Sequence, residues 1–169
     1  MTDTRIEPTR SVPPTLLCVV LLAAMSLPAA ADSEIAALRR ATAPFHSIDV
    51  AFNAGWTTDI TGCLEAPEGG MGHHFANLDV LFDAEVDPLR PETLLYEPRK
   101  DGSLRLVAVE YVIPEDFLPR SAEAPVLFGQ EFHFNEDFGV WALHVWAWRH
   151  NPYGMFEDWN PRVSCEFAS

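Results

Sequence analysis

The sequence predicts an α+β fold: two short N-terminal helices packed on a mainly antiparallel sheet that curls toward a barrel or a sandwich. Apolar residues recur at helical spacing between residues 33 and 54. Farther along the chain, short β-branched and aromatic segments alternate with prolines and glycines, as in a chain of strands and turns. The clearest unit consists of two apolar segments that flank Asp101-Gly102, a dipeptide typical of a β-hairpin turn.

The two helices are expected at residues 33–43 and 47–54. Pro44 ends the first helix, because proline cannot continue a helical hydrogen-bond pattern. Ser47 can cap the second helix, and Gly55 stands where a helix C-terminus favours glycine. Everything after Gly55 is expected to be strand or loop.

The predicted hairpin pairs residues 92–97 with residues 103–113. The second of these segments is apolar on both of its faces, so we expect a central strand that is covered on both sides. Shorter strands are expected in four other segments: 57–64 (TTDITGCL), 130–134 (QEFHF), 140–148 (VWALHVWAW) and 163–167 (VSCEF).

Residues 1–31 have the pattern of an export signal. An apolar segment from Leu16 to Met25 follows two arginines and precedes Ala29-Ala30-Ala31, which matches a signal cleavage site. The apolar segment is too short to span a bilayer, which needs about 20 residues. We therefore expect residues 32–169 to form a single compact domain, exported to the periplasm or the extracellular space, with no membrane segment after signal removal.

The chain is acidic, with 25 acidic against 11 basic residues and a formal net charge of −14. The expected signal contains equal numbers of arginines and acids, so its removal leaves this charge unchanged. Such a charge argues against nucleic acid or an anionic membrane as a partner, because both require a basic surface. A metal ion or a small molecule is the expected partner. The oligomeric state does not follow from the sequence.

Cys63 and Cys165 are the two cysteines that remain after signal removal, since Cys18 leaves with the signal. In an exported protein an even pair predicts a disulfide. This bridge would close a loop on the order of 100 residues and contribute up to about 4.7 kcal/mol in the chain-entropy model. The alternative interpretation, a catalytic thiol, is disfavoured by an oxidising compartment.

Two of the predicted strands carry an ionisable residue within an apolar row. Glu110 shares a strand face with Leu106 and Ala108, and His144 occupies a similar row in segment 140–148. A buried, unpaired charge costs several kcal/mol, so each residue needs a partner or a shifted pKa. Two interpretations remain open: the residues form a structural network, or they face a pocket.

The segment EGGMGHHF, residues 68–75, is expected to be a glycine-rich turn leading into a strand that begins at its two histidines. Neighbouring side chains of a strand point to opposite faces, so only one histidine can reach an interior site. Ala76 shares the face of His74 and leaves room for a ligand beside it. We therefore expect His74 to point inward and His73 to point away.

Together, His74, Glu110 and His144 form the predicted metal site. Two imidazoles and a carboxylate are a common ligand set for zinc, copper or iron. His73 and His133 are reserve ligands. Aromatic side chains on the same strands are expected to line a ligand pocket, namely Tyr111, Trp146 and Trp148.

Several motifs are shared with other sequences, among them LVAVEYVIP and the C-terminal pattern L-H-V-W-x-W…N-P-x-G-x-F…W-N-P-x-V-x-C. A third, M-G-x-H-[YF]-x-N, is matched by Met71, Gly72, His74, Phe75 and Asn77. The chain from about residue 41 to Cys165 thereby resembles a group of small exported bacterial proteins of uncharacterised function. The resemblance implies that His74, not His73, is the family-type histidine, and it implies no activity.

The sequence thus predicts an exported metal-binding protein or small metalloenzyme, with a His/Glu/His site inside a β-sheet pocket. The alternative is a non-catalytic secreted module that binds a small ligand or a partner and whose buried histidines and glutamate are structural. Whether the protein is an enzyme, and on which substrate, does not follow from the sequence.

Overall fold

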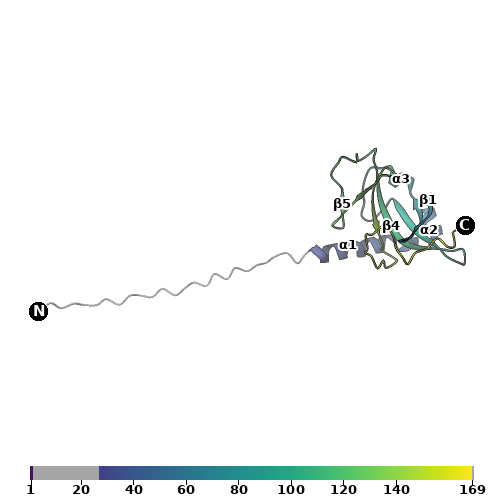
Figure 1. Cartoon of the computed structure of the whole chain (residues 1–169), viewed down its shortest axis with the longest axis horizontal. Coiled ribbons are helices and arrows are strands. Elements are labelled where there is room, and N and C mark those ends of the chain that lie inside the picture. Colours follow the sequence, from purple (N-terminus) through teal and green to yellow (C-terminus); the bar gives the residue numbers. More distant parts are fainter. Residues whose placement is uncertain (2–26, 169) are drawn as a thin grey trace.

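The structure is a computed structural model that describes Met1 and residues 27–168 (Figure 1). It has the predicted α+β class, with helices beside a mainly antiparallel sheet that curls into a half barrel. Most of the expected export signal, residues 1–31, lies outside the described residues. In the part of the chain that the structure describes, no helix is long and apolar enough to cross a membrane.

Both expected N-terminal helices are present. They are α1 (Leu27–Thr42) and α2 (Ile48–Asn53), and a 3-10 helix, η1 (Ala43–His46), joins them. Helix α1 begins at Leu27, ahead of the expected start at residue 33. Pro44 ends the α-helix as expected, but the chain tightens into a 3-10 turn there instead of opening into a loop.

One further helix, α3 (Leu78–Leu81), was not predicted. It is a single turn whose N-cap, Asn77, accepts a hydrogen bond from the backbone N–H of Asp79 at 3.1 Å. A turn of this length shows no helical periodicity, so the only signal was the capping residue itself.

The main sheet has six strands in the order β1-β2-β3-β4-β8-β7, and every neighbouring pair is antiparallel. A second, two-stranded sheet consists of β5 (Val126–Leu127) and β6 (Gln130–Glu131). The strands of the main sheet are β1 (Thr58–Ala66), β2 (Gly69–Ala76), β3 (Thr93–Pro98), β4 (Leu104–Pro114), β7 (His133–Asn135) and β8 (Val140–Val145).

The predicted hairpin is β3–β4, and β4 is central and buried over most of its length, as expected. Strand β8 ends at Val145, earlier than the predicted 148, because the N–H of Trp146 donates to the carbonyl of Met155 and the N–H of Ala147 turns back to the carbonyl of Val145. The strand predicted at 163–167 is wrong. That segment is a loop in which the Val163 carbonyl accepts a hydrogen bond from Gly70.

Strand β4 contains a bulge that breaks the expected alternation of its side chains. Leu95 pairs with Ala108 whereas Tyr96 pairs with Leu106, so Val107 is the extra residue. Leu106 therefore joins the hydrophobic cluster of Val109 instead of sharing a face with Ala108 as predicted. Glu110 lies beyond the bulge, so its own orientation is unaffected.

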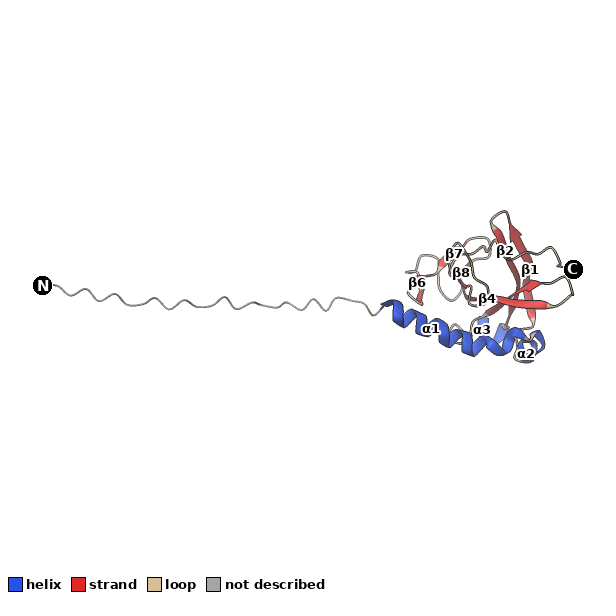
Figure 2. Ribbon diagram, turned by 90° about the horizontal axis from the view of Figure 1, so that it is seen from below, coloured by secondary structure: helices blue, strands red, loops and turns tan. Residues whose placement is uncertain are grey.

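Helices α1 and α2 lie along one side of the sheet (Figure 2). The main core lies between these helices and the sheet. It combines helix residues such as Ile35 and Leu38 with strand residues such as Val109 and Val145. The opposite, concave face of the sheet carries the buried polar residues His74, Glu110 and His144 among smaller apolar clusters. The helices thus complete the core on one face and leave the other face available for a site.

The glycines of EGGMGHHF lie inside β2 and do not form a turn ahead of it, which corrects our expectation. A side chain at Gly70 would place its Cβ 2.7 Å from the carbonyl oxygen of Val163 in the C-terminal loop. Gly72 has φ +92° and its α-carbon packs against the backbone of Tyr96, so a Cβ would overlap that carbonyl. These glycines let neighbouring backbones approach β2 closely.

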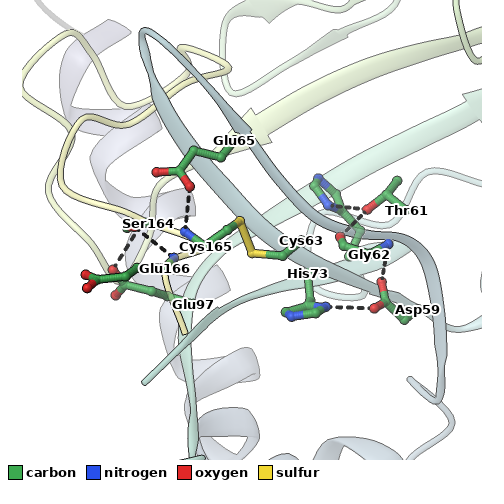
Figure 3. The surroundings of a disulfide bond; sticks show 11 residues. Asp59, Thr61, Gly62, Cys63, Glu65, His73, Glu97, Ser164, Cys165 and Glu166 are labelled. Atoms are coloured by element: carbon green, nitrogen blue, oxygen red, sulfur yellow. Dashed lines mark hydrogen bonds and ion pairs between the residues drawn. A yellow bond between two sulfur atoms is a disulfide. The ribbon is translucent and has the colours of Figure 1, made fainter. Parts of the chain in front are cut away.

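The predicted disulfide joins Cys63 in β1 to Cys165 in the C-terminal loop, across a sequence separation of 102 residues (Figure 3). Next to it, the carboxylate of Glu65 accepts a hydrogen bond from the backbone N–H of Cys165 at 3.1 Å. Backbone bonds between Gly70 and Asn160 hold the same loop against β2. The loop is therefore fastened to the edge of the sheet at several points.

We predict that the Cys63→Ser/Cys165→Ser variant unfolds at lower denaturant concentration, with about 2–5 kcal/mol less free energy of unfolding, because the unfolded chain regains the entropy of a long loop. Urea titration followed by tryptophan fluorescence measures this difference. Wild-type protein under reducing conditions is the matched control and should unfold like the variant. Equal stability of oxidised wild type and variant would contradict the prediction.

Candidate metal centre

Three strands supply the three side chains of the predicted site. Glu110 on β4 lies directly opposite His144 on β8 in the antiparallel ladder, so their side chains are neighbours on one face. His74 comes from β2, on the other side of β3. His74 lies opposite Leu95 of β3, whereas the β3 residue opposite Glu110 is Thr93. The Thr93 hydroxyl donates to the Glu110 carbonyl at 3.0 Å and lies 3.3 Å from its carboxylate.

These three side chains form a compact, buried group that could hold a metal ion. The Nε2 atom of His144 is 3.4 Å from Oε1 of Glu110, and Nε2 of His74 is 3.7 Å from Oε2. One donor atom from each residue lies within 4.8 Å of the others. Three ligands at about 2.0–2.2 Å from one ion lie roughly 3–4 Å from one another. A small inward movement of the imidazoles would therefore let all three donor atoms bind the same ion.

A hydroxyl group orients the His74 ring. The Oγ1 atom of Thr61 has one hydrogen, which it donates to the Gly62 carbonyl at 2.8 Å. It must therefore accept from Nδ1–H of His74, 2.9 Å away. The Nε2 atom of His74 then carries its lone pair and points toward Glu110.

A carboxylate orients the His144 ring in the same sense. Oδ1 of Asp158, in the C-terminal loop, lies 3.2 Å from Nδ1 of His144. Burial opposes ionisation of Asp158, but its hydrogen bond and ion pair with His144 prevail and lower its pKa, so the carboxylate is charged and accepts from Nδ1–H. The Nε2 atom of His144 is buried and makes no hydrogen bond with any residue that the structure describes.

The site favours positive charge near Glu110. Burial lowers the pKa of His74 to about 4, so this imidazole is neutral at pH 7. Burial acts in the same direction on His144, but the nearby Glu110 and Asp158 carboxylates outweigh it and raise the pKa of His144. The neutral His74 ring and the Glu110 carboxylate thus direct lone pairs to a common point, where a proton on His144 or a metal cation would be stabilised.

The group opens on a cavity of about 510 Å³ on the concave face of the sheet. All three residues line it, together with Asp158 and His133. Most of the other lining residues are apolar, and they come from β1, β2, β4, β8, the segment that begins at α3 and the C-terminal loop. A polar group at one place in an apolar cavity is the usual form of a small-molecule site.

The structure separates the reserve ligands from this group. His73 points away, as expected, and its Nδ1 lies 2.7 Å from the Asp59 carboxylate (Figure 3). His133 lines the same cavity, but its Nε2 lies 3.5 Å from Asp158, beyond His144. His133 is therefore next to the Asp158 carboxylate and not among the three converging side chains.

None of the three expected pocket aromatics lines the cavity. Tyr111 lies on the opposite face of β4 from Glu110, and its hydroxyl donates to the Pro88 carbonyl. Trp148 follows the end of β8 and packs toward the helices, where its Nε1–H donates to Thr42. Trp146 stacks near His144 within a buried cluster. The alternation predicted through residue 148 does not hold for Trp146 and Trp148, because β8 ends at Val145.

Sequence analysis missed three polar residues near the site. Thr61 and Asp158 orient the two imidazoles, and neither has a sequence pattern that links it to a distant histidine. The third is Glu92, which is fully buried just before β3 and accepts a hydrogen bond from the N–H of Val112 at 3.1 Å. The predicted hairpin strand begins at Glu92, but an acidic residue at the end of a strand is normally exposed, so nothing in the sequence indicated its burial.

Comparisons with protein-family models, with curated proteins and with solved structures find no match to this chain. The resemblance to small exported bacterial proteins therefore stays a prediction. Arguments about function depend on the geometry of the site alone.

Burial raises the pKa of Glu92 from 4.5 to about 8. The folded state then keeps a proton that the unfolded state loses above pH 4.5, so this group's stabilising contribution is full below pH 4.5 and is lost as the pH rises to 8. We predict that Glu92→Gln removes a destabilisation of several kcal/mol at pH 8, at roughly 1.4 kcal/mol per pKa unit.

The measurement is the free energy of unfolding of wild type and variant by urea titration from pH 4 to pH 8.5. The free energy of unfolding of the variant should increase relative to that of the wild type as the pH rises, because glutamine cannot ionise. Glu123→Gln, at an exposed site, is the control and should follow the wild type. A difference between wild type and Glu92→Gln that does not vary with pH would contradict the assignment.

Proposed function

We propose that this protein binds a divalent transition-metal ion through His74, Glu110 and His144. The observation that carries the proposal is the buried Nε2 of His144, which makes no hydrogen bond with any described residue and faces the Glu110 carboxylate at 3.4 Å and the His74 imidazole. Buried polar groups nearly always have a hydrogen-bond partner. A cation would supply the missing partner for Nε2 of His144, because it would bind this nitrogen together with the Glu110 carboxylate and the His74 imidazole.

The ligand set supports zinc, copper or iron over magnesium or calcium, because two of the three donors are imidazole nitrogens. Three protein ligands beside a cavity would leave a coordination position open on the cavity side, which is the arrangement of catalytic and not of structural sites. Bound there, the ion would act as a Lewis acid toward a ligand in the cavity. The surrounding residues hold the imidazoles in place and exclude water through the apolar wall.

The environment of the histidines supports the same proposal. Metal-bound histidines usually donate their second N–H to a carboxylate or another oxygen, which sets the tautomer and the ring orientation. Asp158 fills that role for His144, and the Thr61 hydroxyl fills it for His74. A purely structural pair would instead need a hydrogen between the imidazoles and Glu110, and the observed separations are long for such bonds.

We place the protein outside the cytoplasm, as an exported protein. A disulfide between Cys63 and Cys165 supports this location, because disulfides persist in oxidising compartments. The apolar segment and the alanine-rich site within residues 1–31 support it independently.

We predict that untagged protein binds about one zinc ion per chain, and that His74→Ala and His144→Ala each abolish stoichiometric binding because each removes one of three ligands. Metal content after dialysis, measured by plasma mass spectrometry, gives the stoichiometry. The same samples can be loaded with iron or copper to rank the metals. Circular dichroism confirms that each variant is folded.

His73→Ala is the matched control, since it removes the adjacent histidine, which pairs with Asp59 away from the site. It should retain full binding. Zinc binding by His74→Ala or His144→Ala at the wild-type stoichiometry would disprove the proposed ligands. Failure of the wild type to retain any of the three metals would disprove the metal site itself and favour a structural network.

We predict that Asp158→Ala lowers metal affinity by about 10–100-fold without abolishing binding, because the variant leaves His144 as a ligand but frees its orientation. Competition with a fluorescent zinc chelator measures the affinity. Asp137→Ala is the control. It removes an acid that lines the same cavity but has no hydrogen bond or ion pair with either imidazole. An equal loss in both variants would indicate a general charge effect, not an oriented ring.

A further inference from the structure

We propose that the cavity beside the metal site binds a small organic molecule with an apolar, aromatic-sized body and a single anionic oxygen donor that completes the coordination of the metal. This inference rests on the proposed metal site and adds to it the chemical class of the ligand. Three features carry it: the wall of the cavity, the charges around it and the side chains at its mouth.

The wall of the cavity is built to take an apolar body. Its volume of about 510 Å³ falls in the range of roughly 300–1,000 Å³ that is usual for small-molecule sites. Outside the three proposed ligands, ten of the remaining described lining residues are apolar and five are polar. Two of those five polar side chains are already engaged: Thr61 with His74, and Asn135 with the backbone N–H groups of the following turn. A sugar or a peptide would therefore leave most of its polar groups without partners. The apolar lining residues are Ile60, Leu64, Met71, Leu81, Phe82, Val112, Pro114, Phe138, Val140 and Trp159.

The charges around the cavity limit the ligand to one negative group. A divalent ion held by one carboxylate and two neutral imidazoles keeps one positive charge, which a monoanionic donor neutralises. No lysine or arginine is present among the described residues that line the cavity, whereas Asp137 and Asp158 both line it. A second anionic group, as in a dicarboxylate or a phosphate ester, would meet only negative charge there.

Two exposed phenylalanines support entry of an apolar ligand. Phe82 and Phe138 both line the cavity, yet they are 59% and 57% exposed to solvent. Phe82 follows α3, and Phe138 lies in the turn before β8, so neither is needed to fill the core. Large apolar side chains that remain exposed at a cavity are typical of a surface that binds a ligand.

The test uses zinc-loaded protein and 2-naphthoate as the probe, by isothermal titration calorimetry at about 0.15 M salt, where long-range repulsion from the acidic chain is screened. We expect saturable one-to-one binding. Methyl 2-naphthoate, which lacks the anionic oxygen, and naphthalene-2,6-dicarboxylate, which adds a second charge, should each bind at least about tenfold more weakly. Metal-free protein should show a similar loss for 2-naphthoate.

Two variants test the cavity without touching the metal ligands. Phe82→Ser and Phe138→Ser should each weaken 2-naphthoate binding by about tenfold, as expected when a large apolar contact is lost, and should leave zinc stoichiometry unchanged. Phe117→Ser is the matched control, because Phe117 is also exposed but does not line the cavity. It should bind 2-naphthoate like the wild type.

The outcomes separate this inference from the metal site. Normal zinc binding without 2-naphthoate binding, or with binding that the phenylalanine variants do not change, would overturn the inference and leave the metal site intact. Equal affinity for 2-naphthoate and its methyl ester would overturn the role of the anionic oxygen. If the protein binds neither zinc nor iron nor copper, the metal site is overturned. The proposed contact between the metal and the anionic oxygen of the ligand is then overturned as well.

Discussion

The buried Glu110 carboxylate between two imidazoles is the constraint on which the arrangement of this protein depends. A charged group with 8% of its surface exposed needs compensation, and the sheet provides it from both sides. His144 is its direct cross-strand neighbour, and His74 reaches it from two strands away because the sheet is curled. A flat sheet would keep His74 and Glu110 apart, so the contact between these two residues depends on the curvature of the sheet.

The C-terminal loop contributes to the same group from outside the sheet. It supplies Asp158, which orients His144, and Trp159, which lines the cavity. The loop can do so only because it lies close against β2, where Gly70 permits backbone contact, and because Cys165 is bridged to β1. Gly70 and Cys165, which are far apart along the chain, therefore both help to hold the Asp158 carboxylate in position.

Two kinds of buried acid lie near β4. Glu110 lies beside two imidazoles. The carboxyl group of Glu92 instead accepts a hydrogen bond from the Val112 N–H, and burial raises its pKa to about 8. The environment, not the residue type, decides which carboxyl is suited to hold a metal. Val112 and Leu81 belong to a small apolar cluster and line the cavity beside Glu110.

Local patterns in the sequence were sufficient for the fold class, the two N-terminal helices, the β3–β4 hairpin and the inward direction of His74, because alternation and capping act over a few residues. They also indicated Glu110 and His144 as ionisable groups in apolar rows, and Cys63 with Cys165 as a pair. Only the tertiary structure could decide the bulge at Val107, the end of β8 at Val145, the burial of Glu92 and the approach of Asp158 and Thr61 to the imidazoles. Each of these depends on contacts between segments far apart in the chain, and no local spacing encodes how strongly a sheet curls or where a loop is fastened to it.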